Sequence, residues 1–195
     1  MTAKRAFDLV VSTVALLLLA PPLVFIGLLV RLTSPGPALF RQQRVGRGGR
    51  LFRIWKFRSM VVDAAACDRA ITAAGDARVT RLGRFLRHTK LDELPQLVNV
   101  WLGDMSLVGP RPEVPRYLAC YTPDDEVVLS VRPGITDPAS ICFRDEERLL
   151  ASFSDPERAY VEVILPAKLA MARDYIGRQS FTGDLKLIFQ TLARL

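Results

Sequence analysis

The stretch LVVSTVALLLLAPPLVFIGLLV, residues Leu9 to Val30, contains no charged side chain and decides which kind of fold this chain adopts. Its 22 residues meet the length of ~20 that an apolar helix needs to cross a bilayer. Pro21 and Pro22 lie in its middle, where each proline removes a backbone donor and clashes with the preceding turn. The stretch therefore predicts a membrane segment that is interrupted halfway.

The flanks of this segment favour one of two topologies. Lys4 and Arg5 precede it and Arg31 and Arg41 follow it, so the positive-inside rule places both ends in the cytoplasm. Each half of about ten residues spans roughly 15 Å, which reaches only the middle of the bilayer. We expect a re-entrant helix-break-helix, with a kinked transmembrane helix as the alternative, because membrane helices tolerate prolines.

Charge is unevenly distributed along the chain. The 195 residues carry a net charge of +7 and are 50% hydrophobic. Residues 1–62 contain ten basic side chains and one acid, Asp8, which gives +9 and leaves −2 for the remainder. A basic N-terminal third of the chain beside an apolar segment indicates that the partner is anionic lipid or phosphate, and no nucleic acid.

Few side chains remain that could carry out chemistry. His88 is the single histidine, which excludes a histidine-centred metal site. No serine stands in a nucleophile-elbow context. Cys67, Cys120 and Cys142 are too scattered for zinc and indicate a reducing compartment. Carboxylates and basic residues must therefore carry any reaction.

Two neighbouring carboxylates stand in TKLDELPQLVNVWLGDMSLVGPRP, residues 89–112. Apolar residues at helical spacing predict a helix that begins near Pro95 and ends at Gly103. Asp92 and Glu93 are then expected at its N-terminus, where the helix dipole favours negative charge and phosphate. Such a carboxylate can attack a phosphoryl centre or hold Mg²⁺. The alternative is a capping box formed by Thr89 and Asp92, with Glu93 in solvent.

Basic residues flank this pair in the sequence. Strand-like runs at Leu39–Val45 and Leu51–Met60, joined by a glycine-rich turn, predict a β-hairpin. Lys56 and Arg58 are expected on one side of the second strand as phosphate ligands. We expect the other hairpin arginines to form an exposed basic face, namely Arg41, Arg44, Arg47 and Arg50.

Three further segments complete the fold expected from the residues. Gly109-Pro110-Arg111-Pro112 is a rigid extended element that would hold Arg111 for bidentate phosphate recognition, and residues 131–136 form a structural turn. Residues 80–87 form a short basic amphipathic segment that leads to the two carboxylates. An apolar stripe in the last helix suits either the membrane interface or the core: Leu185, Ile188, Phe189 and Leu192.

The order of these motifs is similar to that of a known family. KRAFDLV, LFRQQRVG, IWKFRSM, TRLGRFLR, LDELPQLVNVWLGDMSLVGPRP and VRPGIT follow one another from Lys4 onward. The chain resembles the small monotopic phosphoglycosyl transferases, bacterial sugar transferases of the polyprenyl-phosphate hexose-1-phosphate transferase family. The expected class is α+β, mainly helical, with a re-entrant membrane hairpin at residues 1–33 and a cytoplasmic-face catalytic domain at residues 34–195 that carries amphipathic interfacial helices.

The resemblance implies a reaction and its partners. A nucleotide-sugar donor, usually a UDP-sugar, gives its phosphosugar to polyprenol phosphate, and UMP leaves. This first membrane step of polysaccharide or glycoconjugate synthesis, which serves exopolysaccharide or lipopolysaccharide, takes place at the bacterial inner membrane. Membrane lipid is a further partner, and a homodimer is possible. The mechanism is ping-pong through a covalent phosphosugar on Asp92, with Glu93 assisting and Mg²⁺ held by both carboxylates.

The same resemblance implies which residues bind phosphate or nucleotide. They are Lys56, Arg58, Arg87, Pro110, Arg111, Pro112 and Arg144. The segment DPASICFRDEE, residues 137–147, departs from the family pattern, since Phe143 replaces the glycine before Arg144. The resemblance therefore does not imply which sugar this protein transfers. The competing function is a non-catalytic basic membrane-associated adaptor, and a nucleic-acid binder is remote.

Overall fold

The computed structural model describes residues 3–62 and 71–194, so that Cys67 lies outside the described residues. The helices are α1 (Ala3–Thr33), α2 (Arg81–His88), α3 (Gln96–Leu102), α4 (Pro138–Cys142), α5 (Glu146–Ala151), α6 (Pro156–Ala159), α7 (Leu165–Gly177) and α8 (Phe181–Leu192). The strands are β1 (Leu39–Val45), β2 (Leu51–Phe57), β3 (Ser106–Val108) and β4 (Gly134–Thr136). Shorter turns of 3-10 or π type are η1 (Arg47–Gly49), η3 (Leu91–Glu93), η4 (Pro115–Cys120), η5 (Pro123–Ser130) and η6 (Tyr160–Ile164). The predicted mainly helical α+β class is confirmed.

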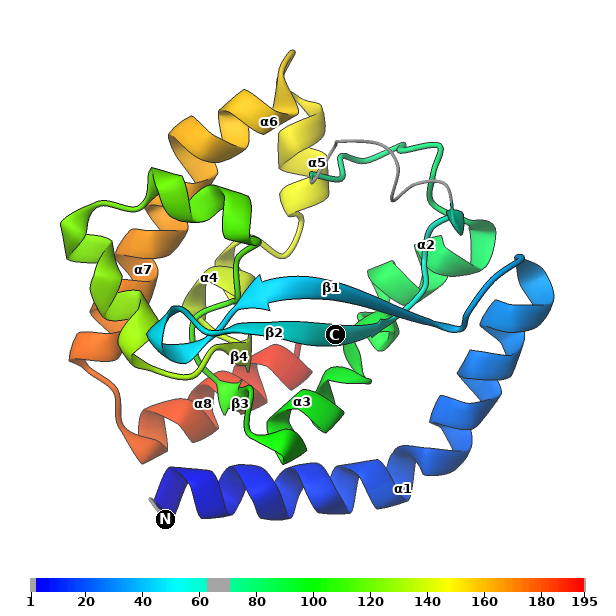
Figure 1. The fold of residues 1–195 in the computed structure, drawn as a ribbon, viewed down its shortest axis with the longest axis horizontal. Coiled ribbons are helices and arrows are strands. Elements are labelled where there is room, and N and C mark those ends of the chain that lie inside the picture. The colour runs from blue at the N-terminus through cyan, green and yellow to red at the C-terminus, as the bar shows by residue number, and fades with distance from the viewer. Residues whose placement is uncertain (1–2, 63–70, 195) are drawn as a thin grey trace.

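The apolar segment forms a single bent helix. α1 stays helical through Pro21 and Pro22, and Figure 1 shows its second half turning away from the first. The predicted break into two half-helices is wrong at this point. Two adjacent prolines leave the carbonyls of Leu17 and Leu18 without helical partners, which bends a helix without ending it. Within the described ranges, α1 is the one helix whose length and mean hydropathy of 2.5 suit membrane crossing.

The start of α1 is attached to the rest of the fold by its charged residues. Lys4 forms an ion pair with the buried Asp184 of α8. The Arg5 guanidinium donates hydrogen bonds to backbone carbonyls at the end of α3, which suits the negative end of that helix dipole. The Asp8 carboxylate accepts a hydrogen bond from the Leu107 amide at 3.1 Å. α1 therefore packs directly on the other elements, and the division at residues 33 and 34 stays a prediction.

The predicted β-hairpin is confirmed. β1 and β2 pair antiparallel from Leu39↔Phe57 to Val45↔Leu51, around a turn in which Gly48 and Gly49 have φ of 66° and 74°. The second strand is shorter than expected, because it ends at Phe57.

A second sheet was not foreseen. β3 and β4 pair in parallel, with Ser106 opposite Gly134 and Val108 opposite Thr136. A Cβ atom on Gly134 would lie 2.1 Å from the Gly109 nitrogen, so the two backbones approach only because both residues are glycine. This sheet brings the turn at residues 131–136 beside the Gly109–Pro112 element.

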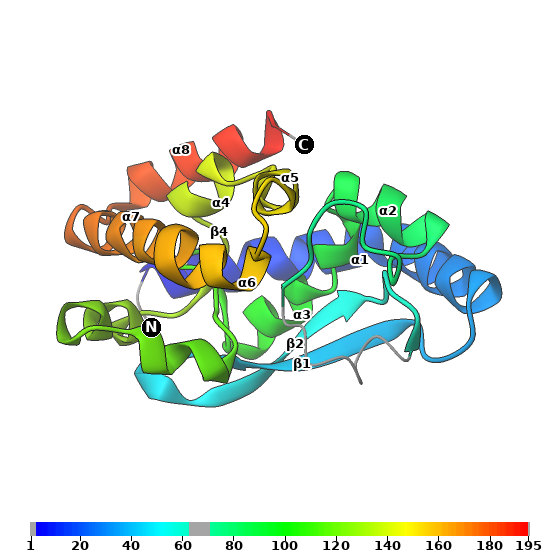
Figure 2. The same cartoon turned by 90° about the horizontal axis from the view of Figure 1, so that it is seen from above.

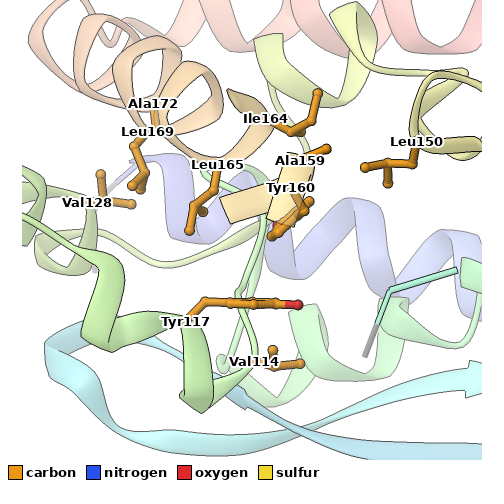
Figure 3. Packing of buried hydrophobic residues seen from close by; sticks show 10 residues of the cluster. All are labelled: Val114, Tyr117, Val128, Leu150, Ala159, Tyr160, Ile164, Leu165, Leu169 and Ala172. Atoms are coloured by element: carbon orange, nitrogen blue, oxygen red, sulfur yellow. The ribbon is translucent and has the colours of Figure 1, made fainter. Parts of the chain in front are cut away.

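The largest apolar cluster lies in the C-terminal half. Residues of η4 and η5 pack against α6, η6 and α7 (Figure 3), and the rings of Tyr117 and Tyr160 lie 5.0 Å apart. Figure 2 shows the β1–β2 hairpin along one edge of the molecule and α8 along the opposite edge, with α3 between them. The space between the hairpin and these helices contains the candidate site.

Candidate active site

Asp92 and Glu93 lie in the 3-10 turn η3, between α2 and α3. Lys90 precedes this turn with a φ of 56°, and α3 follows Pro95 and ends at Gly103 with a φ of 94°. The predicted end of α3 is confirmed, whereas the pair lies before the helix and not in its first turn. The capping-box alternative is wrong, because the Thr89 hydroxyl donates to the Phe85 carbonyl at 2.9 Å and so caps the end of α2.

Glu93 is held by two cations. Lys56 Nζ lies 2.7 Å from Glu93 Oε1, while Arg111 Nη2 and Nη1 lie 2.6 Å from Oε1 and 3.3 Å from Oε2. Burial alone would raise the pKa of Glu93, but the charges and hydrogen bonds of Arg111 and Lys56 together hold it well below the usual value. The structure thus brings together Lys56, Glu93 and Arg111, with Glu93 as a fixed anion.

Asp92 is in a different state although it is the next residue. Its side chain is buried, and Oδ1 has no hydrogen-bond partner among the residues that the structure describes. Burial raises the pKa of Asp92, which the charge of Lys56 opposes and that of Glu93 reinforces. Two adjacent carboxylates with opposite pKa shifts are suited to different chemical roles. Asp92 has a buried oxygen without a hydrogen-bond partner among the described residues, whereas both oxygens of Glu93 are engaged.

Arg87 approaches the pair from α2. Its Nε donates to Glu147 Oε1 at 3.0 Å within an ion pair, and its Nη1 lies 3.4 Å from the Ser59 hydroxyl. Glu147 belongs to the segment that departs from the family pattern. No motif or spacing in the sequence predicts that this segment provides the partner of Arg87.

Arg58 has a different position from the one expected. Because β2 ends at Phe57, Arg58 does not share a strand face with Lys56, and that expectation is wrong. Its guanidinium instead donates to the carbonyl of Val30 in the last turn of α1 and to those of Ser34 and Pro35 just after it. A cation suits the C-terminal end of a helix. A phosphate contact from Arg58 stays a prediction.

Arg44 is a site residue that sequence reasoning missed. Its Nη1 donates to the Pro112 carbonyl at 3.0 Å, and burial lowers its pKa against the opposing charge of Glu113. The pairs Phe40↔Lys56 and Arg44↔Phe52 place Arg44 and Lys56 on one face of the hairpin. This two-residue alternation was the available signal. The expected exposed face holds for the other three arginines, Arg41, Arg47 and Arg50.

A single large cavity of about 1390 Å³ joins these groups. Ligand pockets usually occupy ~300–1,000 Å³, so the cavity has room for more than one small substrate. Pro110, whose carbonyl accepts from the Gly134 amide at 3.0 Å, also lines it. The predicted site residues that line the cavity are Lys56, Arg58, Arg87, Asp92, Glu93, Pro110, Arg111 and Arg144.

The carboxylates can be tested for their fit to Mg²⁺. No group of three or more histidine, cysteine, aspartate or glutamate side chains in residues 3–62 and 71–194 could hold an ion. Mg²⁺ does not need one, since it is usually bound by one or two carboxylates together with substrate phosphates and water. The unpartnered Oδ1 of Asp92 fits this requirement. Glu93 fits it less well, because Lys56 and Arg111 already engage its carboxylate.

Comparison with known families identifies the family of this chain. The model of the family described as bacterial sugar transferase matches residues 1–195. The chain belongs to this family. The family predicted from the order of the sequence motifs is thereby confirmed.

Curated relatives of this bacterial sugar transferase share about two fifths of its residues. The UDP-glucose:undecaprenyl-phosphate glucose-1-phosphate transferase of Escherichia coli (strain K12) is 40% identical over 97% of this chain and 39% of its own length. The undecaprenyl-phosphate glucose phosphotransferase of Komagataeibacter xylinus is 42% identical over 100% of the chain and 36% of its own length. The exopolysaccharide production protein PSS of Rhizobium leguminosarum bv. phaseoli is 40% identical over 97% of this chain and 92% of its own length. The chain thus spans less than two fifths of the first two relatives.

Proposed function

We propose that this protein transfers a sugar 1-phosphate from a nucleotide-sugar, a UDP-sugar, to undecaprenyl phosphate or a similar polyprenol phosphate. The observation that supports this most directly is the unpartnered Oδ1 of Asp92 inside the cavity, beside a Glu93 that two cations hold. Family membership and the names of the relatives support the same donor and acceptor. The products are polyprenyl diphosphate sugar and UMP.

The first half-reaction forms a covalent enzyme intermediate. An oxygen of the Asp92 carboxylate attacks the phosphorus that bears the sugar. The bond from this phosphorus to the oxygen that bridges to the nucleoside phosphate breaks, and UMP leaves with the bonding electrons. Burial supports this role, since it removes the water that would otherwise stabilise the carboxylate in its resting state.

The second half-reaction restores the enzyme. An oxygen of the polyprenol phosphate attacks the same phosphorus, the bond to Asp92 breaks, and the carboxylate is regenerated. The volume of the cavity, about 1390 Å³, supports a site in which the acceptor approaches the intermediate without rearrangement of the fold.

The cations of the site have distinct tasks in this proposal. Lys56 and Arg111 hold Glu93 as an anion, and Glu93 in turn keeps both cations directed at the site. Arg87 stabilises the charge that develops on the leaving phosphate. Mg²⁺ bound by Asp92 and donor phosphate oxygens would neutralise part of the diphosphate charge.

We place α1 in the cytoplasmic leaflet of the bacterial inner membrane as a re-entrant, monotopic element. Its bend at Pro21 and Pro22 supports this placement, as do basic residues at both flanks. Large apolar side chains on α1 are open to the surroundings, with Leu17 at 72% and Leu32 at 81% exposure. An apolar surface of this size is suited to lipid. The catalytic elements then lie at the cytoplasmic face.

The decisive experiment separates the two half-reactions. Purified protein with a UDP-sugar and no acceptor should release UMP in a burst that equals the amount of enzyme, and a sugar-labelled donor should label the protein. Asp92→Asn should abolish the burst, the labelling and the turnover, because the amide is a poor nucleophile. Asp124→Asn, at an exposed position away from the cavity, is the matched control. Full turnover in Asp92→Asn would exclude the covalent mechanism, and no UMP release with any UDP-sugar would favour the adaptor.

A further inference from the structure

One part of the large cavity is apolar and has no task in the chemistry described above. Val11 and Ala15 of α1 line it from one element, and Ile188 and Leu192 of α8 line it from another. All four line the same cavity as Asp92, Lys56 and Arg111. The cavity thus joins charged residues of the hairpin, α2 and η3 to apolar residues that include those of α1 and α8.

The α1 wall is fixed in place. Asp8 and Ser12 are buried at 3% and 0% exposure, which identifies the face of α1 that points into the protein. Val11 lies three residues after Asp8, and Ala15 lies three residues after Ser12. Both therefore lie on or beside the same face of the helix. The hydrogen bond from the Leu107 amide to the Asp8 carboxylate attaches this part of α1 to β3.

The α8 wall runs from the interior to the surface. The hydroxyls of Thr191 and Thr136 lie 2.6 Å apart and join this end of α8 to β4. Ile188 is half-buried, whereas Leu192 is 59% exposed. The last-helix stripe predicted from the sequence is thus split, with Ile188 turned inward and Leu192 at the rim. The apolar part of the cavity therefore reaches the exposed apolar surface.

We infer that the space between Val11 and Ala15 of α1 and Ile188 and Leu192 of α8 binds the isoprene units that adjoin the phosphate of the acceptor. This inference rests on the proposed function. A polyprenol phosphate has an anionic head joined to a branched apolar chain, and this cavity offers the same two chemistries in continuity. A nucleotide-sugar has polar groups along its length and matches only the charged part.

The geometry also explains how the lipid phosphate comes near Asp92. Exposed apolar residues of α1, with Val10 at 62% and Leu18 at 73%, adjoin the face that carries Val11 and Ala15. A chain that lies between α1 and α8 keeps its first isoprene units in apolar surroundings while its phosphate enters the charged part. The remainder of the chain stays among the lipids, so the cost of exposing apolar groups to water is avoided.

Narrowing this space tests the inference. Ala15→Phe should raise the KM for undecaprenyl phosphate by about tenfold or more, since shape changes in apolar pockets discriminate on this scale. Methyl phosphate has no isoprene unit to place in this space, so its reaction with the labelled intermediate should stay unchanged. The UMP burst with donor alone should also stay unchanged. Ile188→Phe narrows the space from the opposite wall and should give the same pattern.

Val10→Phe is the matched control, because Val10 lies on the same helix, is exposed and does not line the cavity. Val10→Phe should leave the KM for undecaprenyl phosphate, the reaction with methyl phosphate and the UMP burst as they are in the wild type. The inference is overturned if both cavity variants keep the burst and bind undecaprenyl phosphate as the wild type does, or if Val10→Phe raises the KM equally. Absence of the burst in the wild-type protein would instead contradict the proposed function, so the two failures are distinguishable.

Discussion

Two of the ion-pair groups that line the cavity, one at the hairpin and one at α5, differ in how firmly they are held. On the hairpin side, Glu93 is engaged by Lys56 and Arg111, and its side chain is 14% exposed. On the α5 side, Arg87 is engaged by Glu147, whose side chain is 42% exposed. Breaking a buried pair leaves uncompensated charge, whereas an exposed pair is worth little. We therefore expect the first group to set the geometry of the site and the second to exchange its carboxylate for a substrate phosphate.

Glu93→Gln tests the buried group and has the largest expected effect. The neutral amide would leave Lys56 and Arg111 without their anion, which should lower the free energy of unfolding by about 3 kcal/mol and leave only a trace of transfer activity. Denaturant unfolding in detergent and UMP release measure the two effects. Glu162→Gln, in an exposed pair with Arg158, should change neither quantity, and equal losses in both variants would contradict a special role for Glu93.

The acid sensitivity of the protein provides a second readout for the same variant. The folded-state pKa of Glu93 is held well below its usual value. Its contribution to stability is therefore present above the pH at which the unfolded carboxyl titrates and is lost as the pH falls through the lower, folded-state pKa. The wild type should lose stability in acid more steeply than Glu93→Gln does.

Lys56→Met is expected to have the next largest effect, about a hundredfold loss of turnover at neutral pH, typical for one electrostatic contact at a reacting centre. Its signature is the pH profile. Burial already raises the pKa of Asp92, and Lys56 opposes that shift. Without the cation the pKa should rise further, so activity should decline on acidification from a higher pH than in the wild type. Arg53→Ala, at an exposed position on the opposite hairpin face that does not line the cavity, should leave the profile unchanged.

These two groups also show what could be derived from the sequence. The hairpin and the end of α3 at Gly103 follow from turn residues and spacing within short segments. These signals are local. The family resemblance implied Lys56, Glu93 and Arg111 as site residues, but it did not predict that both cations converge on Glu93 and leave Asp92 Oδ1 unpartnered.

What the sequence did not predict depends on contacts between distant segments. The parallel pairing of residues 106–108 with 134–136 has no periodic signal in strands of three residues. The Arg87–Glu147 pair joins positions 60 residues apart, and Lys4 meets Asp184 across 180. Propensity and spacing do not specify such pairs, which arise only when the elements pack. The prolines show the opposite error. Pro21 and Pro22 were expected to break the helix, but α1 continues through them and only bends.

Glu147→Gln tests the exchangeable group and has the smallest expected effect. If Glu147 competes with the donor phosphate for Arg87, a neutral side chain should release Arg87 and lower the KM for the UDP-sugar by severalfold, the size that an exposed pair worth up to ~1 kcal/mol permits. The maximal rate should change little, because the intermediate and Asp92 are untouched. High salt should reduce the difference between variant and wild type, since it screens the exposed pair.

Glu157→Gln is the matched control, because Glu157 pairs with Arg116 at a similar exposure of 41% but does not line the cavity. Its KM should equal that of the wild type. A higher KM in Glu147→Gln would mean that the carboxylate positions Arg87 for the donor and does not compete with it. The two ion-pair groups would then both fix geometry, and the segment 137–147, divergent as it is, would be part of the rigid site.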